Sequence, residues 1–83
     1  MENEMTRTEV LEKVQDIVRD AIDREDIILT PETTADDVEG WDSLVHIQIV
    51  AAIQSSFKIR FSALEMISWT NVGELCNAIL SKL

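Results

Sequence analysis

A serine hydroxyl followed three residues later by a histidine is the most chemically suggestive pair in this 83-residue chain. On a helix, Ser43 and His46 would lie one turn apart on roughly the same face, where an imidazole could act as a base for the hydroxyl. A hydrolytic dyad also needs a third, orienting group and an oxyanion site, and the sequence indicates neither. We therefore expect no catalytic residue, and we expect His46 to be an ordinary surface histidine.

The local role of Ser43 depends on where the next helix begins. Ser43–Phe57 is a run of fifteen residues without Asp, Glu, Lys or Arg, and Asp42 precedes it directly. Either Asp42 or Ser43 can be the N-cap of a helix, a role that stabilises the helix by about 1 kcal/mol. Gly40 allows the chain to turn sharply before the helix.

Other reactive residues have simpler interpretations. Cys76 is the only cysteine and falls on the apolar stripe of the last predicted helix, so we expect an inert core thiol. We expect Trp41 and Trp69 to pack in the core or at its boundary. The sequence shows neither metal-ligand spacing nor a glycine-rich phosphate loop, so we predict no metal site.

The charge of −9 is concentrated in one half of the chain. Residues 1–42 contain fourteen acids and four bases, a net of −10, whereas residues 43–83 contain two acids and three bases, a net of +1. Such an acidic half disfavours nucleic acid and anionic membranes as partners. With one cysteine, no signal sequence and no apolar run of about 20 residues, we predict a cytoplasmic protein without stable membrane insertion.

Three helix starts carry a local signature, a capping box with apolar residues at helical spacing after it. The boxes begin at Thr6, Ser62 and Asn71, and they predict helices over about 7–23, 63–68 and 72–82. Hydrophobic staple pairs, Met5 with Val10 and Phe61 with Met66, flank the first two boxes.

The segments between these helices are less regular. Residues 24–42 contain Pro31 and Gly40, which predict a long loop, and its apolar residues should anchor it to the core. Those residues are Ile27, Ile28, Leu29 and Val38. Residues 43–57 alternate in hydrophobicity at their start, as a strand does, but the run is long for a strand and would leave edges unpaired. We therefore predict a helix over about 43–57.

This arrangement resembles the acyl carrier protein family, whose signature is Asp-Ser-Leu at the start of the second helix. Asp42-Ser43-Leu44 follows Gly40 and an aromatic residue, and the similarity extends from about Thr8 to Ser81. It implies an all-α, four-helix acyl-carrier-like bundle with three longer helices, one short helix and a long loop between the first two. We expect residues 1–83 to form a single stand-alone domain, because Met1 and Leu83 lie near the expected domain edges. We also expect a monomer.

The resemblance also implies a function. In this family a phosphopantetheinyl transferase moves 4′-phosphopantetheine from coenzyme A to the serine, here Ser43. Acyl groups are then bound as thioesters to the terminal thiol of this phosphopantetheine arm. The positive end of a helix stabilises a phosphate attached there, and His46 would lie one helical turn from it. Such a carrier is not an enzyme: its partners are the transferase and the enzymes that load and process the acyl group.

One departure from the family pattern bears on docking. The family usually has acids along the second helix, but Val45 and Gln48 occupy positions where acids are common. We expect contacts through Leu44, Val45, Gln48, Ala51 and Ala52, weak electrostatic steering, and a specialised fatty acid, lipid or polyketide pathway. Ordinary core packing is the alternative role for Leu44. Two other functions stay open: an aminoacyl or peptidyl carrier, and an unmodified helical adaptor that binds proteins.

Overall fold

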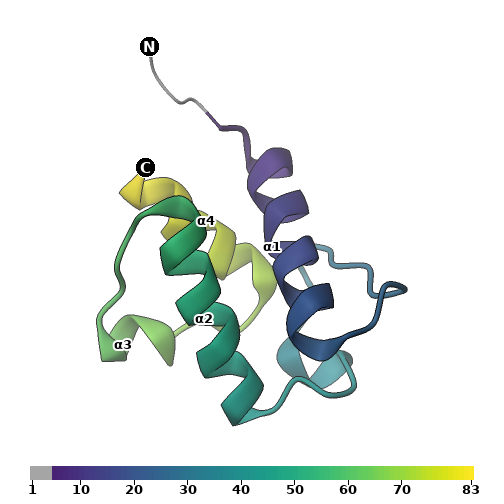
Figure 1. Cartoon of the computed structure of the whole chain (residues 1–83). Coiled ribbons are helices and arrows are strands. Elements are labelled where there is room, and N and C mark those ends of the chain that lie inside the picture. The colour runs from purple at the N-terminus through teal and green to yellow at the C-terminus, as the bar shows by residue number, and fades with distance from the viewer. Residues whose placement is uncertain (1–4) are drawn as a thin grey trace.

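The computed structural model describes residues 5–83, and within this range every regular element is helical (Figure 1). Four α-helices form the bundle: α1 (Arg7–Ile22), α2 (Ser43–Phe57), the short α3 (Ala63–Met66) and α4 (Val72–Lys82). A single turn of 3₁₀-helix, η1 (Ala35–Asp37), interrupts the loop between α1 and α2. The predicted all-α class, with three longer helices and one short helix, is therefore confirmed.

The core lies where α1 meets α2 on one side and α4 on the other. Its largest fully buried side chains come from these three helices and include Ile49, Ile53 and Ile79. In α2 the buried positions are Ile49, Val50, Ile53 and Phe57, which is the spacing of a helix and not of a strand. Burial against α1 thus decides the structure of a segment whose local alternation was ambiguous.

The ends of α1 follow local chemistry. The hydroxyl of Thr6 accepts from the Glu9 amide at 3.1 Å, and the Glu9 carboxylate accepts from the Thr6 amide at 2.8 Å, which confirms the first capping box. The helix ends at Ile22, one residue before the predicted boundary, because Asp23 adopts the left-handed conformation with φ 65°. A residue in this conformation terminates the helical hydrogen-bond pattern.

The long loop is tied to α1 by two side chains. Gln15 accepts from the Leu29 amide at 2.9 Å, and Arg19 Nε donates to the Ile27 carbonyl at 2.7 Å. Ile27 and Leu29 are buried, as expected, and Val38 packs against the core. The expectation for Ile28 was wrong: its side chain is 73% exposed, because it points away from the face on which its two neighbours are buried.

The start of α4 closes the other side of this loop. The amides of Val72 and Gly73 donate to the carbonyls of Thr33 and Pro31, both at 2.8 Å. A side chain at position 73 would place its Cβ 2.9 Å from the Pro31 carbonyl oxygen, so glycine permits this close approach. These two bonds satisfy amides that every helix leaves free at its N-terminus.

The third capping box was only half right. The Asn71 side chain accepts from the Glu74 amide at 2.9 Å, as predicted, but the Glu74 carboxylate accepts from the Thr70 amide and not from that of Asn71. The box at the start of α3 is complete between Ser62 and Glu65.

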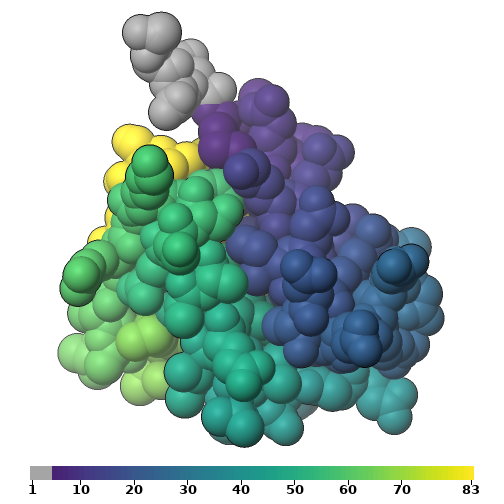
Figure 2. Space-filling model, in the orientation of Figure 1, coloured from purple at the N-terminus to yellow at the C-terminus, as the bar shows by residue number. Residues whose placement is uncertain are grey.

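The predicted end of α3 needs a correction. The helix ends at Met66 and not at 68, because Ile67 leaves helical geometry at ψ 2° and the amide of Ser68 turns back to the Glu65 carbonyl at 3.1 Å. A helix this short depends on tertiary contacts for its stability. Figures 1 and 2 show that α3 lies at one side of the bundle, beside α2.

Candidate functional site

The start of α2 presents Ser43 to solvent. Asp42 is the N-cap, since its carboxylate accepts from the Val45 amide at 2.9 Å and its backbone is extended. Ser43 is therefore the first residue of the helix, and its side chain is exposed. Of the two residues that the sequence allowed as caps, the aspartate takes the role, which leaves the serine hydroxyl free of it. Figure 1 places this end of α2 at the edge of the molecule opposite the C-terminus.

Gly40 makes the turn that aims this helix start. Its φ is +95°, a conformation that residues with a side chain rarely adopt. A Cβ there would also lie 3.0 Å from Cγ2 of Ile22 at the end of α1. Two residues earlier, the Val38 carbonyl accepts from the Trp41 amide at 3.2 Å and closes the turn. The predicted sharp turn therefore exists, and only glycine fits it without strain.

A solvent-open groove of about 660 Å³ lies beside Ser43. The loop before α2 forms one wall, through Trp41 and the 3₁₀ turn, and the end of α3 forms the other, through Met66 and Ile67. Ser43, His46 and Ile47 contribute the side of α2 that faces the groove. A smaller pocket of about 180 Å³ adjoins it and extends toward Val72 and Leu75 of α4. Ser43 is thus placed next to a hollow that can lodge part of a flexible group.

His46 is not the free surface histidine that we expected. Its ring is half-buried, Nδ1 lies 3.3 Å from Trp41 Nε1, and Nε2 lies 3.0 Å from the Met66 carbonyl oxygen. Both ring nitrogens are engaged, so neither is available to take a proton from Ser43. The structure therefore agrees with the expectation that this pair is not a hydrolytic dyad.

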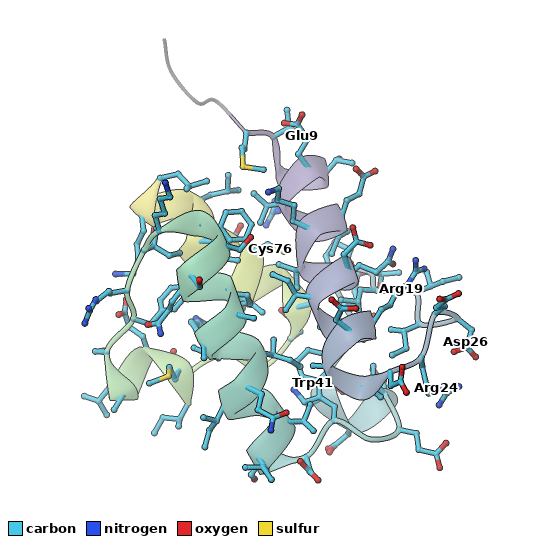
Figure 3. The ribbon with its side chains drawn as sticks, viewed as in Figure 1. Glu9, Arg19, Arg24, Asp26, Trp41 and Cys76 are labelled. Atoms are coloured by element: carbon cyan, nitrogen blue, oxygen red, sulfur yellow. The ribbon has the colours of Figure 1, made fainter. Side chains whose placement is uncertain are left out.

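The two tryptophans lie at the boundary of the core, as predicted. Trp41 stacks on the His46 ring with centroids 6.2 Å apart, and Trp69 meets the same ring edge-on at 6.2 Å. Figure 3 shows Trp41 near the lower end of the bundle, where α2 begins. Trp69 in turn packs edge-to-face on Phe61, with centroids 4.8 Å apart. These contacts build the floor of the groove from aromatic rings.

Helix α2 and the α3 region expose four large apolar side chains, two of which, Ile47 and Ile67, line the groove. Leu44 is 66% exposed, so core packing is excluded for it, and Ile47 one turn further is 62% exposed. Leu64 and Ile67 of the α3 region are 75% and 78% exposed. We call these four residues the apolar rim. Of these, only Leu44 was expected to be a docking residue, although the three-residue spacing from Leu44 to Ile47 places both on one face of a helix.

The other expected docking residues divide into two groups. Gln48, Ala51 and Ala52 are exposed on α2, whereas Val45 is half-buried and packs against the core. Val45 therefore offers less surface to a partner than we expected. Two acids, Asp36 and Asp42, line the groove at the Ser43 end. Helix α2 itself carries no Asp, Glu, Lys or Arg, so the negative charge near this face comes from the residues that precede the helix.

Cys76 takes no part in this site. It is buried in α4 (Figure 3), and burial raises the pKa of its thiol from 9.0 to about 11. The thiol therefore stays protonated at neutral pH and is a poor nucleophile, in agreement with the predicted inert role. Among residues 5–83, no three His, Cys, Asp or Glu side chains cluster as metal ligands would. No helix in that range is long and apolar enough to cross a bilayer.

Comparison with known proteins agrees with this geometry. A family model described as "Phosphopantetheine attachment site" matches residues 12–79. An acyl carrier protein of Cyanidium caldarium is 33% identical over 81 residues, which span 95% of this chain and 92% of the relative. The solution NMR structure of a holo acyl carrier protein from Geobacter metallireducens has a TM-score of 0.82 and 34% identity, covering 88% of this chain and 84% of that one.

A helical bundle with a match to the phosphopantetheine attachment model over most of its length defines a carrier domain. The chain belongs to the acyl carrier protein family. Its prosthetic group is 4′-phosphopantetheine, held covalently. Proteins of this family are carriers and not catalysts; as a family they work with phosphopantetheinyl transferases and acyl-processing enzymes. The predicted family, fold and cofactor are therefore confirmed.

The residues at the start of α2 fit such a group. An exposed hydroxyl stands at the first helical position, where backbone amides and the helix dipole favour an attached phosphate. The adjoining groove has room for part of an extended arm, and its walls are mostly apolar and aromatic. The arm, when bound, supplies the thiol on which a thioester forms. The protein itself supplies the hydroxyl, the helix terminus and the surface that partners contact.

Proposed function

We propose that Ser43 is the attachment residue and that the protein carries acyl groups as thioesters between separate enzymes. The observation that supports this proposal is that Asp42, and not Ser43, caps α2, so the exposed side chain of Ser43 is not used as the cap. In the modification, Ser43 Oγ forms a new bond to phosphorus and loses its proton. The nucleotide part of coenzyme A leaves from the same phosphorus atom. Ser43 is then an attachment point, and the later chemistry belongs to the enzymes that bind the protein.

Mass spectrometry of the apo protein tests the attachment residue. After incubation with coenzyme A and a promiscuous phosphopantetheinyl transferase, we expect the added mass of one arm. Ser43→Ala should abolish the gain, whereas Ser56→Ala, which removes another exposed hydroxyl from the same helix, should leave it intact. No gain in the wild-type protein would instead favour the unmodified protein-binding adaptor. A gain in Ser43→Ala would move the attachment to another residue.

We also propose that partner enzymes dock on the apolar rim through a surface that is itself largely apolar. The rim lies beside Ser43, and α2 has no charged residue between Ser43 and Phe57 to pair with a basic patch. Gly40 and Asp42 would act indirectly, by fixing the direction and the first turn of α2. Such a surface suits dedicated enzymes of a specialised fatty acid, lipid or polyketide pathway, and the cargo follows from which enzyme docks. We place the protein in the cytoplasm as a monomeric, single-domain carrier over residues 1–83.

The salt dependence of turnover tests this mode of docking. Interactions between exposed charges weaken markedly as the ionic strength rises from about 0.01 to 0.15 M. We expect the kcat/KM of an acyl-processing partner for the loaded carrier to change less than about threefold over this range. Leu44→Ala and Ile47→Ala should each reduce it, whereas Ser55→Ala, at an exposed position later in α2, should not. A steep loss with salt in the wild-type protein would contradict an apolar docking surface.

A further inference from the structure

Trp41, His46 and Met66 come from three separate segments and meet next to Ser43. Trp41 Nε1 lies 3.3 Å from Nδ1 of His46, and Nε2 of the same ring lies 3.0 Å from the Met66 carbonyl oxygen. An indole N–H can only donate a hydrogen bond, so Nδ1 is the acceptor. A carbonyl oxygen can only accept, so Nε2 carries the proton. The two partners together define one neutral tautomer of His46.

The Met66 carbonyl needs such a donor. Met66 is the last residue of α3, so no continuing helix supplies an amide to its carbonyl. Among the hydrogen bonds of residues 5–83, the one from His46 is the direct link between α2 and α3. An ion pair of Glu65 with Lys82 at 3.3 Å, partly exposed to solvent, is a second polar contact of this short helix, and Met66 also packs against the core. The hydrogen bond from His46 is therefore a main polar restraint on the position of α3.

The same imidazole lines two hollows. Trp41, His46 and Trp69 line both the groove of about 660 Å³ and the smaller pocket of about 180 Å³. The Trp41 ring stacks on the His46 ring, and the Trp69 ring meets it edge-on. The position of the imidazole therefore shapes both hollows.

We propose that His46, as the neutral Nε2–H tautomer, is a positioning residue that fixes the groove wall beside Ser43. It holds the end of α3 through Met66 and the loop before α2 through Trp41. Its consequence for modification and docking rests on the proposed attachment at Ser43. The tautomer and the position of α3, however, can be measured on the unmodified protein.

Nuclear magnetic resonance of the full apo chain tests the tautomer and its role. Long-range ¹H–¹⁵N spectra at pH 8 should show the proton on Nε2, and a proton on Nδ1 would overturn the proposal. His46→Gln keeps a donor near the position of Nε2, whereas His46→Phe keeps a ring but no donor. We expect amide exchange in residues 63–68 to be about fivefold faster in His46→Phe and within twofold of wild type in His46→Gln. Unchanged exchange in His46→Phe would refute the link to α3.

The indole N–H resonance of Trp41 separates this role from simple packing. His46→Phe removes the acceptor of that N–H, so we expect its resonance to shift relative to wild type, with the indole N–H of Trp69 as the internal reference. Trp41→Phe retains the bond from His46 to Met66 and should leave exchange in α3 unchanged. An unshifted Trp41 resonance in His46→Phe would overturn the proposal.

Transferase kinetics extend the test to function. We expect His46→Phe to gain the arm about fivefold more slowly than wild type and His46→Gln to gain it at nearly the wild-type rate. Equal rates in all three proteins would overturn the functional part of the proposal. If no protein gained mass, the attachment at Ser43 would fail, while the resonance measurements would still decide the role of His46.

Discussion

The cap of α2 offers a sharp test of how the site is built, through the pair Asp42→Ala and Asp42→Asn. The Asp42 carboxylate accepts from the Val45 amide at 2.9 Å at the exposed start of α2. Loss of a cap costs about 1 kcal/mol. Loss of a negative charge at a helix N-terminus costs a further 0.3–1 kcal/mol, roughly, at low salt.

These magnitudes predict different results for the two variants. Alanine removes both the cap and the charge, so we expect the free energy of unfolding to fall by about 1.5 kcal/mol. Asparagine caps as well as aspartate and removes only the charge, so we expect a fall of about 0.5 kcal/mol. For a domain of this size, 1 kcal/mol corresponds to roughly 4–8 °C in Tm.

Urea unfolding of the apo protein, followed by circular dichroism at low salt, measures both values. Asp42→Asn is the matched control, since it retains the hydrogen-bonding side chain at the same position. Equal losses in the two variants would show that charge and not the hydrogen bond stabilises the start of α2. No loss in Asp42→Ala would show that Asp42 is not the cap, and Ser43 could then hold that role with its own hydroxyl.

Two further predictions concern the turn and the core. Gly40→Ala should lower the free energy of unfolding by about 1–2 kcal/mol, since residue 40 has φ +95° and a Cβ there would lie 3.0 Å from Ile22. Urea unfolding measures this loss, and an unchanged unfolding midpoint would contradict it. Burial raises the pKa of Cys76 from 9.0 to about 11, so the folded thiol keeps a proton that the unfolded thiol loses. The resulting stability is present below pH 9 and is lost as pH rises toward 11. Between these two pH values, the difference in unfolding free energy between wild type and Cys76→Ala should therefore shrink by an amount on the order of 2 kcal/mol. A constant difference would mean that the thiol is not buried in the folded protein.

Much of the helical framework could be predicted from local chemistry. The boxes at Thr6 and Ser62 form as predicted because donor and acceptor lie three residues apart in the chain, and no other segment is required. The box at Asn71 is half right because Thr70 competes for the same carboxylate. The end of α3 was predicted two residues too late, because the backbone leaves helical geometry at Ile67.

The site could be predicted in part. The Asp-Ser-Leu motif was enough to single out Ser43, but two adjacent residues could each cap the helix, and only the structure shows that Asp42 does so. The role of His46 could not be predicted, because its acceptor belongs to Met66, twenty residues away. The same holds for Ile28, whose neighbours Ile27 and Leu29 face the core while it faces water.

The sequence by itself determined the helical class, the sites where three helices begin and the serine that stands at the start of α2. These features depend on hydrogen bonds and apolar spacing within a few residues of chain. The tertiary structure alone decided that Val45 packs inward while Leu44 and Ile47 face out, and that His46 joins α2 to α3. The physical reason is distance along the chain: each of these outcomes depends on burial against, or a bond to, a segment that is remote in sequence and near only once the bundle has folded.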